Sequence, residues 1–377
     1  MENIETLLEK FKSYKSIIVF GAGNTAVAFS EAFKIMNLFQ KIKFYAVSNT
    51  GENPANIYGI SVRNIDDLTM YRNDSLIIVA TAEKSYRDIE EKLKFLGYDH
   101  ILDFTFESSN WSVLREHYLV HIFAERKEQC VCFHQDNNVF PSLSNVKKVS
   151  KIFMIKSHLD SCIMGNVHND YASYLIPLQV GKSLTDQSIS ALQDNMGDNI
   201  SSKNASFCEL TGHYWIWKNV MAEWVGVCHY RRHFELTEQD ITEIEGAGYD
   251  VVLPVPIVNI PNVSFIYGKD HNPKDWNCMM DVLHQMYPEY YATAEMAFQD
   301  VYYYGYNMMI AQKKIFDSYC SWLFPLLFEI EKTNASVHQD RYQSRYIGFL
   351  AERLTSLFFI HNKKNLHILW AHKIFYR

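Results

Sequence analysis

The sequence predicts an α/β protein built from two successive α/β units. Two observations lead to this fold class. Residues 1–105 alternate short apolar runs with amphipathic stretches, a rhythm typical of βαβ units that form a parallel sheet. A second series of such runs begins at residue 151, after a polar stretch. The 377 residues are 48% hydrophobic and 21% charged, so the chain is long and apolar enough to bury a substantial core.

The elements of the first unit follow from its apolar runs. We expect buried strands at residues 16–20, 42–48, 75–82 and 100–104, and helices at residues 21–39 and 83–98. The turn GAGNTA lies between the first strand and the first helix. Its Gly21, Gly23 and Ala26 have the spacing of a Rossmann-like nucleotide-binding turn, in which backbone N–H groups at the start of the helix hold a phosphate.

An acidic residue that would bind a ribose is missing from the end of the second strand, where Ser48 and Asn49 stand instead. This absence argues against NAD. Three interpretations of the turn stay open: binding of a nucleotide or nucleotide sugar, redox chemistry, and close packing without a ligand. The segment as a whole resembles the small Rossmann-like modules attached to bacterial sugar-modifying and polysaccharide-assembly enzymes.

Residues 106–150 lose the βαβ rhythm, and we expect them to form a linker region. The seven cysteines are odd in number and several lie in apolar runs, which favours buried thiols in a reducing compartment over disulfides. Cys130, Cys132 and His134 would share one face of a strand. Because a zinc site needs about four ligands and no second pair lies nearby, we predict no metal site there.

Charge and hydropathy exclude several classes of protein. A net charge of −7 argues against a general nucleic-acid binder. The sequence has no signal peptide and no apolar run long enough to span a membrane, so we expect a cytoplasmic protein. The basic, aromatic residues 363–377 leave two interpretations open: peripheral contact with an anionic membrane surface, or a docked terminal segment.

The second unit is predicted at residues 151–377. Its expected strands include residues 151–160, 224–230, 249–257 and 301–311. One helix face is indicated by apolar residues at helical spacing, namely Phe207, Leu210, Tyr214, Trp217 and Met221. Two capping boxes are indicated by spacing, one at Ser206 and Glu209 and one at Thr237 and Asp240.

The segment CELTGHYWIWKN, followed by VGVCHYRRHF, resembles a family of bacterial capsular and exopolysaccharide glycosyltransferases long known only as a domain of unknown function. The resemblance continues through YNMMIAQKKIFDSYCSWLFPLLFEIEK and YQSRYIGFLAERL. It implies a GT-A-like α/β domain that binds a nucleotide sugar at the C-terminal ends of its strands. The family's characteristic positions fall on Glu209, Trp215, Trp217, Lys218, Asn219, His229, Tyr230, Arg231, Arg232, Asn307, Arg345, Glu352 and Arg353.

Glycosyl transfer expels a diphosphate, and the site must offer positive charge to it. GT-A enzymes commonly hold a divalent metal there with an Asp-x-Asp motif, which this sequence lacks. Arg231 and Arg232 stand at the corresponding strand end, and guanidinium groups bind phosphate oxygens bidentately. We therefore predict that a divalent metal is not essential. A purely structural cluster of ion pairs is the alternative.

Strand alternation would place His229 with Arg231 on one side of the sheet and Tyr230 with Arg232 on the other. One arginine would then bind phosphate while the other holds a carboxylate. The catalytic candidates are Arg231, Arg232, His229, Glu209, His271 and Asp275, the last two as bases in a turn-rich stretch. The donor-binding candidates are Tyr230, Trp215, Lys218, Asn219, Asn307, Arg345, Glu352 and Arg353.

For several of these candidates, a purely structural role is the alternative to ligand binding. Trp217 lies on the apolar helix face, so Trp215 is the better candidate to stack on a sugar or base. Asn307 would bond sugar hydroxyls or be satisfied by backbone groups. Arg345 and Glu352 would close the donor pocket or form a solvated ion pair.

We expect a hexosyl-type glycosyltransferase that uses a nucleotide sugar, taken here as a UDP-sugar, and a glycan or polyprenyl-linked acceptor in surface polysaccharide synthesis. Two other functions compete with it. One is a nucleotide-dependent oxidoreductase or epimerase that uses the GAGNTA turn. The other is a non-catalytic carbohydrate-binding protein.

Overall fold

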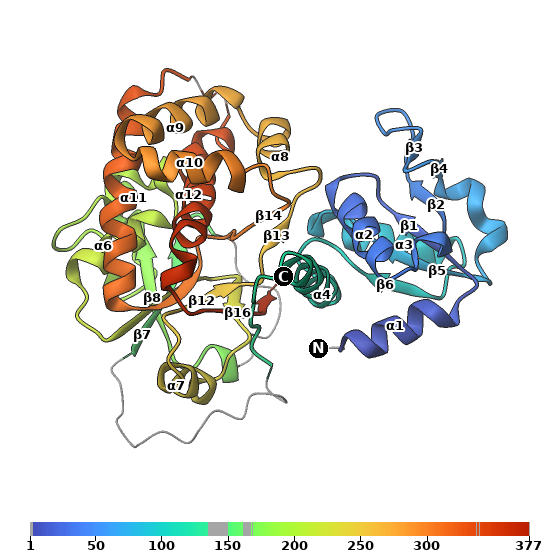
Figure 1. Cartoon of the computed structure of the whole chain (residues 1–377), viewed down its shortest axis with the longest axis horizontal. Helices are drawn as coiled ribbons and strands as arrows, with labels where there is room; N and C mark the ends of the chain where they lie inside the picture. The colour runs from blue at the N-terminus through green and yellow to red at the C-terminus, as the bar shows by residue number, and fades with distance from the viewer. Residues whose placement is uncertain are drawn as a thin grey trace. The chain divides into compact units, whose positions relative to one another are not determined.

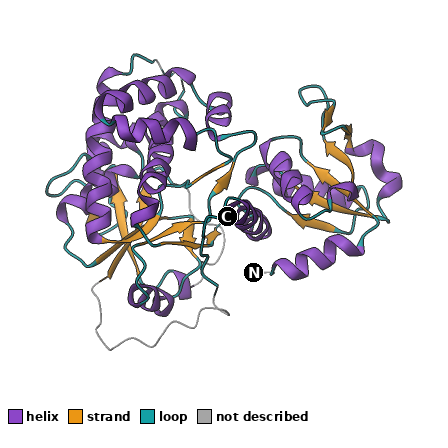
Figure 2. Cartoon of the chain, in the orientation of Figure 1, coloured by secondary structure: helices purple, strands orange, loops and turns teal. Residues whose placement is uncertain are grey.

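The computed structural model describes residues 3–134, 150–160, 167, 169–336, 338 and 340–376. The chain divides into two compact units, Met1–Gln129 with Val258–Ile260 and Cys130–Ile257 with Pro261–Arg377. Each unit combines helices with a sheet that contains parallel strand pairs (Figure 2). The prediction of two α/β units is therefore confirmed.

The first unit contains a six-stranded sheet among its described residues, with strand order β3-β4-β2-β1-β5-β6 (Figure 1). The strands are β1 Ser16–Phe20, β2 Ile42–Val47, β3 Asn56–Ile57, β4 Ile60–Asn64, β5 Ser75–Val79 and β6 Ile101–Asp103. The helices are α1 Ile4–Ser13, α2 Asn24–Ile35, α3 Tyr86–Phe95 and α4 Ser109–Glu125. All neighbouring strands except β3 and β4 are parallel, as the βαβ rhythm predicts.

The GAGNTA turn connects β1 to α2, where the sequence predicts it. Gly21 has φ +135, and a Cβ atom there would lie 2.3 Å from the carbonyl oxygen of Ala80. Gly23 has an ordinary φ of −91 at the N-cap of α2, with open space around the position of a Cβ. Ala26 is fully buried. Close backbone approach therefore requires glycine at the first of the two positions.

The linker prediction for residues 106–150 is wrong in its first part, because residues 109–125 form helix α4 of the first unit. The Ser108 side chain caps this helix by accepting a hydrogen bond from the N–H of Trp111. Its buried residues, among them Trp111, Leu114, Tyr118 and Leu119, recur at helical spacing and form one broad face. The remainder of the predicted linker, residues 135–149, lies outside the described residues.

The second unit is built on a sheet whose described strands follow the order β16-β12-β15-β10-β7-β8-β9. The strands in this half of the chain are β7 Ser150–Ser157, β8 Leu175–Val180, β9 Leu192–Gln193, β10 Trp224–His229, β11 Arg232–Phe234, β12 Val251–Pro254, β13 Ile257–Val258, β14 Tyr302–Tyr303, β15 Met309–Gln312, β16 Ile368–Ala371 and β17 Lys373–Phe375. The helices are α5 Asn204–Phe207, α6 Leu210–Asn219, α7 Glu238–Gly246, α8 Val263–Asp270, α9 Pro273–Met286, α10 Pro288–Ala297, α11 Lys313–Thr333 and α12 Tyr346–Asn362.

The directions of the strands determine which strand ends lie at the same edge of this sheet. Strand β10 is parallel to β7, which is parallel to β8, and β15 is antiparallel to both β10 and β12. The C-terminal ends of β7, β10 and β12 and the N-terminal end of β15 therefore lie at one edge. Helices α11 and α12 pack against each other in the same unit (Figure 1).

The C-terminal segment is docked into the second unit. Strand β16 pairs with β12, and β17 pairs with β11. Trp370 is 2% exposed and Lys373 is 5% exposed. Of the two interpretations of residues 363–377, docking is therefore the one that the structure shows. In the described part of the chain, no helix combines the length and the apolar character that crossing a membrane would need.

The predicted helix through residues 207–221 is broken in two. Cys208 has φ +51 and separates α5 from α6. Phe207 and Leu210 are fully buried on either side of this break, whereas Met221 lies beyond the end of α6 at Asn219 and is 86% exposed. The expected capping box at Ser206 and Glu209 does not form, whereas the one at Thr237 and Asp240 is confirmed.

Candidate active site

The HYRR segment forms a tight hairpin rather than the continuation of a strand. Strand β10 ends at His229, the chain reverses at Tyr230 and Arg231, and β11 begins at Arg232. His229 lies directly opposite Arg232 in the antiparallel pair, so the two share a face of the sheet. The predicted alternation, which paired His229 with Arg231, is therefore wrong because it assumed that the strand continued.

His229 holds the backbone of a neighbouring turn. Its Nε2 lies 2.5 Å from the carbonyl oxygen of Tyr306. Because a carbonyl only accepts, Nε2 carries the proton and donates it. Burial, aided by the nearby charge of Arg232, lowers the pKa of His229 to about 4. The imidazole is therefore neutral at neutral pH and acts as a hydrogen-bond donor to the turn.

The turn at Tyr306 and Asn307 is strained and links the two carboxylates of the site. Both residues have left-handed backbones, with φ +70 and +47, a conformation that costs a non-glycine residue about 1–2 kcal/mol. The N–H of Tyr306 donates to Oε1 of Glu352 at 2.9 Å. The Nδ2 of Asn307 donates to Oε1 of Glu209 at 2.6 Å. One dipeptide thus positions both acids.

The side chain of Asn307 makes its hydrogen bonds to other groups of the protein. Its side chain is fully buried, and Nδ2 also contacts the carbonyl oxygen of Gly348 at 3.3 Å. Its Oδ1 accepts a hydrogen bond from Thr355 at 3.2 Å. The predicted strand at 301–311 is interrupted here, because β15 starts only at Met309. The burial favours the alternative that protein groups satisfy this amide over direct contact with a sugar hydroxyl.

Glu209 lies at the N-cap of α6 without capping that helix through its side chain, and its carboxylate accepts a hydrogen bond from Asn307. Burial raises the pKa of Glu209, and the hydrogen bond from Asn307 and the charges of Arg345 and Arg232 partly oppose that rise. Its second oxygen, Oε2, accepts no hydrogen bond from another described residue. Glu209 is thus held at one oxygen and open at the other.

Glu352, on α12, is held at both oxygens. Oε1 accepts the N–H of Tyr306, and Oε2 accepts from Nη1 of Arg353 at 2.8 Å. Burial raises the pKa of Glu352; Arg353 opposes this rise, and the negative charge of Glu209 adds to it. The adjacent residues Tyr306 and Asn307 hold the two carboxylates through separate hydrogen bonds.

The two arginines of the hairpin have different surroundings. The charge of Arg232 acts on both Glu209 and Glu352. Arg231 stands in the turn itself, 5.7 Å from the ring of Phe375, and its buried Nε has no hydrogen-bond partner among the described residues. Arg232 therefore lies near the carboxylates, and binding of an anion by Arg231 stays a prediction.

Arg345 and Arg353 approach the cluster from the start and the middle of α12. Arg353 is 4% exposed, and its guanidinium lies 4.5 Å from the ring of Tyr303. Arg345 is exposed and donates from Nε to the Sγ of Cys208 at 3.2 Å. Within the described residues, the ion-pair partner of Glu352 is therefore Arg353 rather than the expected Arg345.

The tryptophans of α6 pack in the protein interior. Trp215 is 8% exposed, and its indole N–H donates to the carbonyl oxygen of Met196 at 2.8 Å. Trp217 is half-buried and stacks on Phe324 with ring centroids 5.7 Å apart. The sequence favours Trp215 over Trp217 as the residue that stacks on a sugar or base. The burial of the two side chains favours the opposite order, because Trp215 is the more deeply buried.

The other donor-binding candidates lie on the surface or at the edge of the hairpin. Lys218 and Asn219 are exposed at the end of α6, and Asn219 donates to the carbonyl oxygen of Asp198 at 2.8 Å. The N–H of Tyr230 bonds the carbonyl oxygen of Ile155 at 3.0 Å. Donor contact by these side chains stays a prediction.

The two candidate bases near residue 270 have structural surroundings. Asp275 is fully buried in the first turn of α9, and its oxygens lie 2.8 Å from His338 and 2.8 Å from Asn334. His271 stands between α8 and α9 and stacks on Phe349 at 4.2 Å. Burial lowers the pKa of His271 to about 4. The stretch that the sequence predicts to be turn-rich is thus mostly helical.

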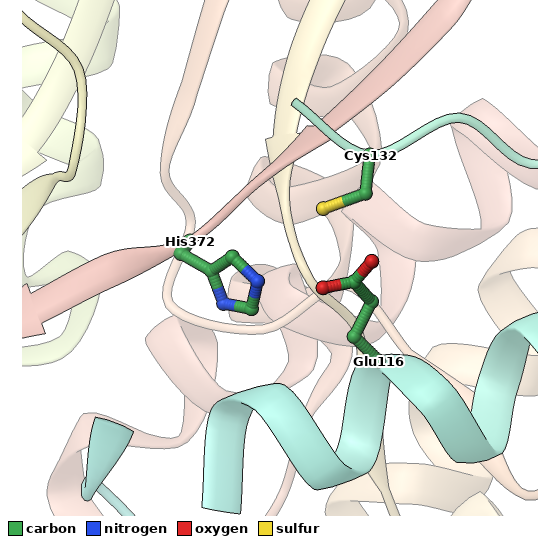
Figure 3. Close-up of side chains that lie close together, drawn as sticks. All are labelled: Glu116, Cys132 and His372. Atoms are coloured by element: carbon green, nitrogen blue, oxygen red, sulfur yellow. The ribbon is translucent and has the colours of Figure 1, made fainter. Parts of the chain in front are cut away.

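No metal site is predicted at Cys130, Cys132 and His134, which would share one face of a strand. Cys132 forms an isolated bridge to β16, and its Sγ lies within 4.8 Å of a ring nitrogen of His372 in the same unit (Figure 3). Figure 3 also labels Glu116, which belongs to helix α4 of the first unit. Two ligand atoms of the second unit are fewer than the four that a structural zinc site needs.

The part of the chain that matches a known family contains all residues of the cluster described above. Residues 163–363, more than half of the chain, match the family described as Domain of unknown function (DUF4422). The chain belongs to the DUF4422 family. The glutamates Glu209 and Glu352, the HYRR hairpin and the Tyr306–Asn307 turn all lie inside the DUF4422 range. No curated protein matches the chain.

A solved structure adds a similarity beyond the family. The chain is similar to the apo structure of WbbM, a bifunctional glycosyltransferase, with 27% identity and a TM-score of 0.50. The match covers 60% of this chain and 45% of the WbbM chain, so this DUF4422 protein corresponds to less than half of that protein. Together with the sheet order, the similarity confirms the predicted fold class of a Rossmann-like unit followed by a GT-A-like α/β unit.

Proposed function

We propose that this DUF4422 protein is a glycosyltransferase that moves a sugar from a nucleotide-sugar donor to a glycan or lipid-linked acceptor. The observation that carries the proposal is the cluster of two carboxylates and several arginines at the edge where the C-terminal ends of the parallel strands meet. The similarity to WbbM supports this class of reaction. Hexosyl transfer in bacterial surface polysaccharide synthesis, with a UDP-sugar as donor, is the specific form that we propose.

Arg231 is our candidate for binding the donor diphosphate. When the bond to the sugar breaks, the diphosphate gains negative charge, and a fixed cation stabilises that charge most strongly at the transition state. The guanidinium of Arg231 stands at the tip of the hairpin, with an Nε that lacks a hydrogen-bond partner in the described part of the chain. Arg232, in contrast, lies near the two carboxylates, and its positive charge compensates their negative charge.

A divalent metal is not essential in this proposal. The sequence lacks an Asp-x-Asp motif, and the hairpin offers fixed positive charge at the strand end. A metal that an Asp-x-Asp motif holds would neutralise the same phosphate oxygens, so the arginines replace its electrostatic role. We therefore expect turnover to persist in excess EDTA.

The test begins with a thermal-shift screen of the common nucleotide sugars and an assay of sugar transfer and donor hydrolysis. With the donor that the screen identifies, Arg231→Ala should lower turnover about a hundredfold or more, equivalent to about 2–4 kcal/mol. Arg231→Lys should rescue only partly, because an ammonium lacks the planar fork of donors. The control is Arg87→Ala, at an exposed arginine of the first unit.

Two results would reject parts of the proposal. Turnover that EDTA abolishes and manganese restores would reject the replacement of the metal by arginine. A wild-type protein that binds no nucleotide sugar, and neither transfers sugar nor hydrolyses any donor, would reject the glycosyltransferase itself. Quenching of NADH fluorescence by the wild-type protein would then favour the oxidoreductase alternative.

A further inference from the structure

We propose that Glu209 is the general base that removes the proton of the acceptor hydroxyl, and that Glu352 and the Tyr306–Asn307 turn position it. This inference rests on the proposed glycosyltransferase function and assigns its base. It goes beyond the pattern of the sequence, which left Asp270, His271 and Asp275 open as candidate bases and did not separate the roles of the two glutamates.

The first argument is the difference in hydrogen bonding between the two carboxylates. Both oxygens of Glu352 are occupied, one by the N–H of Tyr306 and the other by Arg353. Apart from its own backbone N–H, Glu209 accepts a hydrogen bond from one other described residue, Asn307, at Oε1, and Oε2 accepts none from another described residue. A base needs an oxygen with a free lone pair, and Glu209 provides one.

The second argument is how firmly the free oxygen is placed. Glu209 follows the left-handed residue Cys208 and begins helix α6, so its backbone belongs to a defined turn. The 2.6 Å bond from Asn307 fixes the carboxylate, and Asn307 is itself fixed by its contacts with Gly348 and Thr355. The direction of Oε2 is therefore set before any substrate binds.

The third argument is the surroundings of the other titratable groups. Both oxygens of Asp275 are engaged, by His338 and Asn334. Burial lowers the pKa of both His229 and His271 to about 4, which makes them weak bases at neutral pH. Burial raises the pKa of Glu209 instead, which strengthens it as a base.

The step balances as a single displacement. The proton of the acceptor hydroxyl moves to Oε2 of Glu209 while the acceptor oxygen forms a bond to the anomeric carbon. The bond from that carbon to the diphosphate oxygen breaks, and its electron pair leaves with the nucleoside diphosphate, whose charge Arg231 stabilises. Glu209 returns its proton to water afterwards. The product therefore has inverted anomeric configuration.

The decisive variant is Glu209→Gln, in which the amide oxygen still accepts the hydrogen bond of Asn307 but the group no longer takes a proton. We expect kcat to fall by about 10²–10⁴-fold while KM for the donor changes by less than about threefold. Glu245→Gln, at a buried glutamate of α7, is the matched control and should retain turnover within about threefold. The unfolding temperature of each variant checks that it is folded.

Two further measurements separate a base from a merely structural carboxylate. The wild-type kcat should fall as the pH drops through the raised pKa of Glu209, and this acidic limb should be absent from the residual activity of Glu209→Gln. NMR of the product should show inversion at the anomeric carbon.

The outcomes distinguish this inference from the proposed function. If the wild-type protein transfers sugar but Glu209→Gln keeps more than about a tenth of its kcat, or if the product retains its configuration, the role of Glu209 is overturned and the glycosyltransferase stands. If the wild-type protein neither transfers sugar nor hydrolyses any donor, both are overturned. Loss of kcat with inversion and a missing acidic limb supports the assignment.

Discussion

Buried carboxylates in the second unit differ in how many of their oxygens are held by neighbouring donors. Asp275 is held at both oxygens by His338 and Asn334, and Glu352 is held at both by Tyr306 and Arg353. A buried charge without such partners is costly, and paired charges are often structural. The residue type alone therefore does not identify a catalytic acid, whereas the number of unbonded oxygens separates the candidates.

At Asp275 we predict a change in stability rather than in chemistry. Asp275→Asn removes the negative charge beside His338 in a fully buried site, so the free energy of unfolding should fall by about 2–4 kcal/mol. Urea unfolding measures this loss, and kcat is measured at a temperature at which the variant is folded. A variant as stable as the wild type but without turnover would return Asp275 to the candidate bases.

The raised pKa of Glu209 predicts how stability depends on pH. A carboxyl group with a raised folded-state pKa contributes stability when protonated, and this contribution is lost as the pH rises through the folded-state pKa. Replacement by glutamine removes this dependence. The stability of Glu209→Gln relative to the wild type should therefore be greater at pH 7 than at pH 5, as measured by urea unfolding. An equal difference at both pH values would show that the folded-state pKa is not raised.

At the scale of elements, the site is assembled by short breaks in regular structure. The β10–β11 hairpin, the left-handed Cys208 between α5 and α6, and the left-handed Tyr306 and Asn307 before β15 all contribute to it. Strained backbones of this kind persist only where the surrounding structure fixes them, and they gather at functional sites. The sequence patterns treated all three segments as continuous helix or strand.

The GAGNTA turn allows a matched test of one such backbone requirement. Gly21→Ala would place a Cβ 2.3 Å from the carbonyl oxygen of Ala80 at a φ of +135, and we expect it to lower the free energy of unfolding by about 2 kcal/mol or more. Gly23→Ala meets open space at an ordinary φ and should cost well under half as much. Urea unfolding measures both, and equal losses would contradict the role assigned to Gly21.

At the scale of the whole molecule, the boundary between the units falls between residues 129 and 130, inside the range 106–150 that was predicted as a linker, although that range is not a linker throughout. Helix α4 belongs to the first unit, and Cys132 already pairs with β16 of the second. The N–H of Phe133 donates to the carbonyl oxygen of Trp370, and the N–H of Trp370 donates to the carbonyl oxygen of Val131, at 2.8 Å each. These two bonds join the segment to the second unit.

This boundary predicts that a fragment of residues 130–377 folds alone and is more stable than one of residues 151–377. The shorter fragment lacks the two hydrogen bonds to Trp370 and leaves part of β16 uncovered, so its unfolding temperature should be lower by several degrees. Circular dichroism during heating measures both fragments. Equal unfolding temperatures would show that residues 130–150 do not stabilise the second unit.

Some features were determined by the sequence alone. The βαβ rhythm, the Gly21 turn, the capping box at Thr237 and Asp240, and the position of the HYRR segment at a strand end were all predicted and are found. Each depends on residues close together in the chain, where periodicity and turn chemistry act directly. Resemblance to a glycosyltransferase family added candidate residues but did not separate their roles.

Only the tertiary structure decided which of these residues meet. Glu209 and Glu352 come from different helices, and the turn that bonds both begins at Tyr306, far from either in the sequence. Helix α4 lies in a segment that was predicted as a linker because the βαβ rhythm ends there, and the hairpin reversed the expected sides of His229 and Arg232. Local patterns record burial and turns along the chain, whereas a hydrogen-bond partner depends on which distant elements pack together, and that is fixed only when the sheet and helices assemble.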